Sequence, residues 1–121
     1  MILADTSVWI GHFRQNDERL AGLLDATGLL IHPFVIGELA VGNLRQREAT
    51  IDYLSSLPPA TLATDREVLQ FIEANALFGL GLGYVDAHLL ASVRLTPGAT
   101  LWSGDKRLAD VADRMGLVAA R

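Results

Sequence analysis

The chain has 121 residues, half of them hydrophobic, and a formal net charge of −4. It has no cysteine, and this absence excludes disulfides and thiolate metal sites and favours the reducing cytoplasm. We expect a single domain over residues 1–121, without a membrane span or signal peptide, because no apolar run is long enough and no basic segment precedes one. The negative charge argues against a nucleic-acid partner, unless clustered acids hold cations that reverse the local field.

The first half of the chain alternates short apolar runs with helical patterns. The apolar run at 2–4 is followed at once by Asp5, Thr6 and Ser7, which indicates a buried strand leading into a capped helix. Pro33 suits the first turn of a helix that continues through a very apolar stretch. The predicted elements are strands at 2–4 and 29–31 and helices from Thr6, at 16–26, at 34–41 and at 47–57.

The second half continues this alternation. Thr64 and Glu67 have the spacing of a capping box, so a helix should begin there and bury Val68, Leu69, Phe71 and Ile72. The glycine-rich residues 78–83 predict a loop, and the helix after it is apolar on most sides, as in a central or interface helix. The predicted elements are strands at 61–63, 99–102 and 117–119 and helices from Thr64, at 84–95 and at 106–115.

This order of elements predicts an α/β fold, a three-layer α/β/α sandwich with a central parallel sheet of four to five short strands. In such folds the working residues gather beyond the carboxyl ends of the strands. Asp5 and Asp105 directly follow predicted strands, and Asp86 lies in the first turn of the apolar helix at 84–95. Glu38 lies in the middle of the apolar helix at 34–41, where we expect it to be buried.

Four acids in one region would be costly unless a cation joined them. A carboxylate that is buried alone loses several kcal/mol of solvation, and neighbouring carboxylates repel each other. A divalent ion relieves both costs, and carboxylate oxygens suit Mg²⁺. The structural alternatives stay open for three acids, because Asp5 and Asp105 can cap helices and Asp86 can favour a helix N-terminus. A buried Glu38 in mid-helix has no such alternative.

The other polar residues have weaker signals. His12, His32 and His88 lack a second histidine at the spacing of a zinc site, so we expect packing or surface roles. Ser7 is not part of a nucleophile-elbow pattern, and residues 79–83 lack the lysine of a phosphate loop. The sequence therefore favours neither a zinc enzyme nor a serine hydrolase.

Two basic pairs are candidates for contacts with a phosphate backbone. Lys106 and Arg107 directly follow Asp105, whereas Arg45 and Arg47 form a cluster that is more typical of a solvated face. Lys and Arg bind phosphate groups. Because Lys106 and Arg107 are next to Asp105, they are better placed than Arg45 and Arg47 to bind a phosphate beside a reaction centre.

Four segments resemble, in order and at similar separations, the acidic motifs of PIN domains of the VapC toxin family. The family often has Thr two residues before its last Asp, where this chain has Ser103, whose hydroxyl can make the same hydrogen bond. The four segments are Asp-Thr-Ser-Val-Trp-Ile at 5–10, Pro-Phe-Val-Ile-Gly-Glu-Leu at 33–39, Gly-Tyr-Val-Asp-Ala-His-Leu-Leu-Ala-Ser at 83–92 and Leu-Trp-Ser-Gly-Asp-Lys-Arg-Leu at 101–108.

The resemblance implies a metal-dependent endoribonuclease that acts as the toxin of a toxin–antitoxin pair. It implies hydrolysis of RNA phosphodiester bonds with Mg²⁺ or Mn²⁺, a homodimer, and a cognate antitoxin that inserts a segment over the active site. The site residues it implies are the acids Asp5, Glu38, Asp86 and Asp105, which hold metal, and the hydroxyls Thr6 and Ser103, which orient carboxylates.

Two alternative functions remain. A phosphoacceptor receiver domain has similar length and an acidic Mg²⁺ pocket, but it needs adjacent acids after its first strand, and here Ala4 precedes Asp5. A catalytically inactive PIN-like module that binds RNA or protein is the second alternative. The presence of all four acids argues against it.

Overall fold

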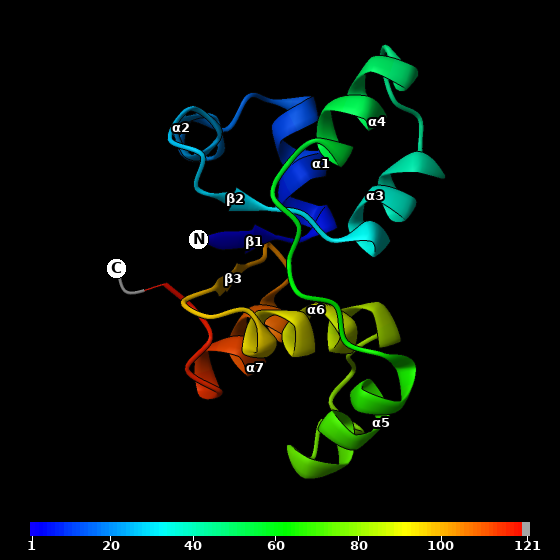
Figure 1. Cartoon of the computed structure of the whole chain (residues 1–121), viewed down its shortest axis with the longest axis vertical. Helices are drawn as coiled ribbons and strands as arrows, with labels where there is room; N and C mark the ends of the chain where they lie inside the picture. The colour runs from blue at the N-terminus through cyan, green and yellow to red at the C-terminus, as the bar shows by residue number, and fades with distance from the viewer. Residues whose placement is uncertain (120–121) are drawn as a thin grey trace.

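A parallel sheet lies at the centre of the structure, a computed structural model that describes residues 1–119 (Figure 1). The strands β1 (Ile2–Ala4), β2 (Leu29–Leu30) and β3 (Thr100–Trp102) pair in the order β2-β1-β3. On the central strand, Leu3 lies opposite Leu30 on one side and Leu101 on the other. Apolar residues suit this strand because a parallel sheet is covered on both faces.

The described residues form seven helices, which lie in two groups on opposite sides of the sheet in Figure 1. Helices α1 to α4 lie above the strands in that view and α5 to α7 lie below them. No helix within residues 1–119 has the length and apolar character needed to cross a membrane. The helices are α1 (Thr6–Arg14), α2 (Glu18–Asp25), α3 (Pro33–Ala40), α4 (Arg47–Ser55), α5 (Asp65–Ala74), α6 (Tyr84–Leu95) and α7 (Lys106–Arg114).

The sheet has three strands within residues 1–119, fewer than the four to five predicted. Residues 61–63 are not a strand; the chain makes only an isolated parallel bridge between Ile31 and Pro59. The bridge is made by the Ile31 N–H, which donates to the Pro58 carbonyl at 2.8 Å, and by the Ala60 N–H, which donates to the Ile31 carbonyl at 2.9 Å. The next donor after Ile31 on this edge would be residue 33, a proline without an N–H, so the ladder does not continue. Residues 117–119 are not a strand either, although the Leu101 N–H donates to the Leu117 carbonyl over 2.7 Å.

The two helices with the strongest sequence signals are where the sequence predicts them. The capping box of α5 is present, with the Glu67 N–H bonded to Thr64 Oγ1 at 3.1 Å and the Thr64 N–H bonded to Glu67 Oε1 at 2.9 Å. Val68 is fully buried behind it, but the prediction for Leu69 is wrong, because that side chain is 59% exposed. Helix α6 has the predicted limits and is buried continuously from residue 87 to residue 93.

Candidate active site

Asp5 is the most tightly held of the four acids. It follows β1 directly, and its N–H donates to the carbonyl of Trp102 on β3 at 3.0 Å. Its Oδ1 accepts hydrogen bonds from the Val8 N–H at 3.1 Å and from Ser7 Oγ at 2.5 Å, while Oδ2 accepts one from Ser103 Oγ. Asp5 therefore caps α1, which is the structural role that the sequence left open for it. Its carboxylate has a fixed orientation, and the residue is only 5% exposed.

Glu38 is exposed, so the prediction that it is buried is wrong. Helix α3 is apolar almost throughout in sequence, but it packs on the core through the face that carries Val35 and Leu39. Glu38 lies on another face, and its Oε1 accepts a hydrogen bond of 2.6 Å from Thr6 Oγ1 on α1. This contact holds α1 and α3 together beside Asp5.

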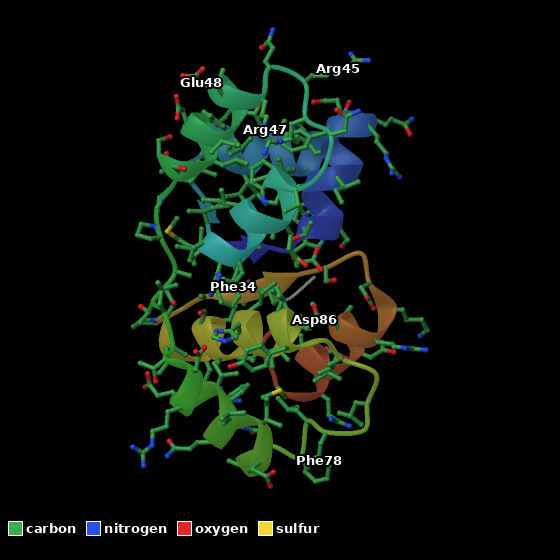
Figure 2. All side chains as sticks on the ribbon, turned by 90° about the vertical axis from the view of Figure 1, so that its right-hand side faces the viewer. Phe34, Arg45, Arg47, Glu48, Phe78 and Asp86 are labelled. Atoms are coloured by element: carbon green, nitrogen blue, oxygen red, sulfur yellow. The ribbon has the colours of Figure 1, made fainter. Side chains whose placement is uncertain are left out.

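Asp86 is partly buried in the first turn of α6, and its Oδ2 accepts a hydrogen bond from the Gly83 N–H at 3.0 Å. Burial raises the pKa of its carboxyl, the Gly83 N–H lowers it, and the negative charges of Asp105, Asp5 and Glu38 raise it further. The carboxylates that influence Asp86 thus come from three other parts of the chain. Figure 2 shows Asp86 on α6, where the two groups of helices meet.

Asp105 caps α7, which is the structural role that the sequence left open for it. Its Oδ1 accepts hydrogen bonds from the Arg107 N–H at 2.9 Å and the Leu108 N–H at 3.4 Å. Its own N–H donates to Ser103 Oγ at 2.9 Å, and the same hydroxyl donates to Asp5. Ser103 therefore links two of the acids, at the position where the VapC resemblance expects a hydroxyl.

Ser7 is a residue of this site that the sequence analysis does not identify. Its Oγ donates to Asp5 and accepts a hydrogen bond from the Gly104 N–H at 2.9 Å. A Cβ at Gly104 would lie 3.2 Å from that Oγ, so the absence of a side chain there leaves room for the contact. The available signal is a serine two residues after a capping aspartate, where its hydroxyl can reach the carboxylate.

The donor set suits a hard divalent cation. Glu38 Oε2, Asp86 Oδ1 and Asp105 Oδ2 accept no hydrogen bond from any residue in the range 1–119, so each leaves an oxygen open. No group of three acids or imidazoles in that range is close enough to enclose an ion by itself. Mg²⁺ keeps several waters and needs only one or two carboxylates, so this arrangement fits an ion held partly through water.

The family model of the PIN domain matches residues 2–114. This chain belongs to the PIN-domain family. Ribonuclease VapC32 from two strains of Mycobacterium tuberculosis is similar to it, with 47% identity over 120 residues, which cover 99% of this chain and 97% of the relative. The match confirms the resemblance to VapC proteins and excludes the receiver-domain alternative.

A groove of about 960 Å³ lies beside Glu38 in this PIN domain, between α1, α3 and the segment that leads into α4. Glu38 lies on its wall, together with the exposed apolar side chains of Ile10 and Phe13. Arg45, one of the predicted RNA contacts, lies on its wall. The lining residues are Ile10, Phe13, Arg14, Glu38, Leu39, Gly42, Asn43, Leu44, Arg45, Gln46 and Thr50.

Two of the other basic candidates already have partners in the PIN domain. The guanidinium of Arg47 donates to the carbonyls of Ala40 and Gly42, at the carboxyl end of α3. Lys106 Nζ lies 3.3 Å from Asp110 Oδ2 in an exposed pair along α7. In Figure 2, Arg45 and Arg47 lie at the far end of the upper group of helices, well separated from Asp86.

The histidines have the packing roles expected of them. His12 Nδ1 accepts a hydrogen bond from the Asp17 N–H at 3.0 Å, and His32 Nδ1 caps α3 by accepting one from the Phe34 N–H at 3.0 Å. Burial, with a smaller contribution from the neighbouring His88, lowers the pKa of His32 to about 4. His32 is therefore neutral at pH 7 inside the PIN domain.

Proposed function

We propose that this PIN domain is a cytoplasmic endoribonuclease, the toxin of a toxin–antitoxin pair, which hydrolyses RNA phosphodiester bonds with Mg²⁺ or Mn²⁺. The observation that carries the proposal is that hydrogen bonds connect Asp5 with Asp105 through Ser103 and fix Glu38 to Thr6, the residue after Asp5, and that the charges of all three acids raise the pKa of Asp86. Mutual repulsion of this kind lowers stability, so we infer that function keeps these acids together. The similarity to ribonuclease VapC32 supports RNA as the substrate.

The roles of the residues follow from their contacts. Glu38 and Asp86 present open oxygens to the ion, Asp5 contributes a negative charge in a fixed orientation, and Asp105 completes the acidic edge. When bound, the ion would lower the pKa of an attacking water and neutralise charge on the phosphoryl group. Thr6 and Ser103 orient Glu38 and Asp5, because a carboxylate that ligates metal needs hydrogen-bond partners to hold its direction.

The groove beside Glu38 supports the antitoxin as a partner. Its apolar wall, with Ile10 and Phe13, suits the apolar side chains of an inserted segment. Glu38 on its wall would attract a basic side chain of that segment. An antitoxin seated there would block RNA from the acids, which is how a toxin of this class is neutralised.

We also propose a homodimer, formed through exposed aromatic side chains of α3 and α6. Most of α6 is buried within the chain's own core, so that helix offers little free surface. Phe34 on α3 and Tyr84 on α6 remain exposed, and both rings pack against His88, with centroid distances of 4.6 and 4.7 Å. A second copy on this aromatic patch would cover it. Light scattering should show a dimer that Phe34→Glu disrupts; a monomeric wild type at tens of micromolar, as a rough working range, would contradict the dimer.

The test of the proposed function is cleavage of RNA by the purified protein. We expect cleavage with Mg²⁺ or Mn²⁺ that stops with EDTA, and its loss when Asp5, Glu38 and Asp86 are all changed to the amides, with circular dichroism showing an intact fold. Asp110→Asn is the matched control, because this acid lies on the exposed surface of α7 and pairs only with Lys106. Cleavage by the triple variant at the wild-type rate would contradict the site assignment, and an inactive wild type would favour the non-catalytic PIN-like module.

A further inference from the structure

The loop before α6 lies against the side chain of Arg107. Gly81, in this loop, has φ +80°, a left-handed conformation that favours glycine. A Cβ built on Gly81 would lie 2.7 Å from Arg107 Nη1, 3.2 Å from Cδ and 3.3 Å from Cζ. The end of the arginine side chain therefore occupies the space that any side chain at this position would need.

This contact connects the segments that carry two of the acids. Arg107 lies in the first turn of α7, two residues after Asp105, and its N–H is bonded to that carboxylate. Gly81 lies two residues before Gly83, whose N–H is bonded to Asp86. Arg107 thus lies between the segments that carry Asp86 and Asp105.

The guanidinium of Arg107 is free to take a ligand. It forms no ion pair with any carboxylate in residues 1–119, although Asp105 is close in the chain. An arginine presents five N–H donors in a fork that matches a phosphate group. Of the four basic residues predicted to touch RNA, Arg47 and Lys106 have partners, and Arg45 lies far from Asp86.

We infer that Arg107 binds a backbone phosphate of the RNA beside the scissile bond, and that Gly81 is the positioning residue that keeps the guanidinium there. A restrained side chain loses less rotational freedom on binding than a mobile one, so the contact with Gly81 strengthens phosphate binding. Because Arg107 would bind a phosphate of the RNA backbone and not a base, it should contribute equally to the binding of RNAs of different sequence. This inference rests on the proposed ribonuclease function and names how that site binds its substrate.

Gly79 offers a matched control for a substitution at Gly81. Both glycines lie in the same loop with positive φ, so an alanine at either position meets similar backbone strain. A Cβ at Gly79 would meet nothing within 4 Å, whereas one at Gly81 would displace Arg107. Thermal melts should therefore show similar destabilisation for Gly79→Ala and Gly81→Ala, and any difference in RNA binding comes from Arg107.

The experiment measures KM, kcat and the affinity for a fluorescent single-stranded RNA as a function of salt. We expect Arg107→Ala to raise KM about tenfold with little change in kcat, and to lower the slope of log K against log salt by about one. Gly81→Ala should raise KM by about threefold or more, while Gly79→Ala stays near the wild type. Arg107→Lys, which keeps the charge but not the fork, should fall between Arg107→Ala and the wild type.

A double-mutant cycle decides whether Gly81 acts through Arg107. In the Arg107→Ala background, Gly81→Ala should raise KM no further. An equal effect of Gly81→Ala in both backgrounds, or equal effects of Gly79→Ala and Gly81→Ala, would overturn the inference. The binding assay does not depend on cleavage, so it tests the phosphate site separately from the ribonuclease function. If the wild type is inactive but its RNA affinity still depends on Arg107 and Gly81, the ribonuclease function is refuted and the phosphate site is supported.

Discussion

Asp86 is an acid whose ionisation the fold opposes. Burial and the charges of Asp105, Asp5 and Glu38 raise its pKa, and the hydrogen bond from Gly83 offsets only part of this. Because the folded-state pKa lies above the unfolded value, the ionised carboxylate lowers the stability of the metal-free fold at neutral pH, and protonation in acid restores it. Asp86→Asn removes the charge and keeps an oxygen for the Gly83 N–H. We therefore expect the free energy of unfolding in EDTA to stay unchanged or to rise.

Added metal should stabilise the wild type much more than it stabilises Asp86→Asn. With free Mg²⁺ or Mn²⁺ at ten times its dissociation constant, mass action stabilises the wild type by about 1.4 kcal/mol. For a domain of 121 residues this corresponds to a rise of about 5 °C in Tm. Asp86→Asn should show a much smaller rise, because the substitution removes both a ligand and a negative charge. Thermal melts of both proteins, first with EDTA and then with metal, measure these shifts.

Asp110→Asn is the control for the loss of one negative charge. Asp110 lies on the exposed surface of α7, 3.3 Å from Lys106, and has no part in the acidic site. Its variant should respond to metal as the wild type does. The reasoning is refuted if Asp86→Asn is clearly destabilised in EDTA while the wild type is indifferent to metal, because Asp86 would then be a structural residue at the start of α6.

Two further predictions concern His32 and Ser103. His32 is 1% exposed with a pKa of about 4 against 6.5 in the unfolded chain, so unfolding takes up a proton between these values and stability should fall as the pH is lowered through this window. The expected loss is on the order of 2 to 3 kcal/mol. Denaturant titrations at several pH values should show a smaller loss for His32→Asn, which can still cap α3, and equal losses would contradict the prediction. Ser103→Ala should lower kcat or the metal affinity about 10-fold to 100-fold, and Ser103→Thr should restore the wild-type value. Wild-type kinetics in the alanine variant would show that the hydroxyl does not orient Asp5.

Local sequence chemistry determined the helices, the three paired strands and the four acids of the candidate site. The limits of α6 and the capping box at Thr64 follow from periodicity and cap residues, which act within a few positions of each other. Asp5 and Asp105 were identifiable because they follow strands, and parallel strands present their carboxyl ends at one edge of the sheet. The hydroxyl of Ser103 was identifiable only through the VapC motifs.

Tertiary structure decided which faces of these elements pack and which side chains meet. An apolar run predicted a buried Glu38, but a helix that packs through one face leaves the residues of its other faces at the surface. The pairing of Ser7 with Gly104 joins positions 97 apart, and the contact of Gly81 with Arg107 joins a loop to a helix. Such contacts depend on how distant segments approach each other, and hydrophobic periodicity carries no information about that approach.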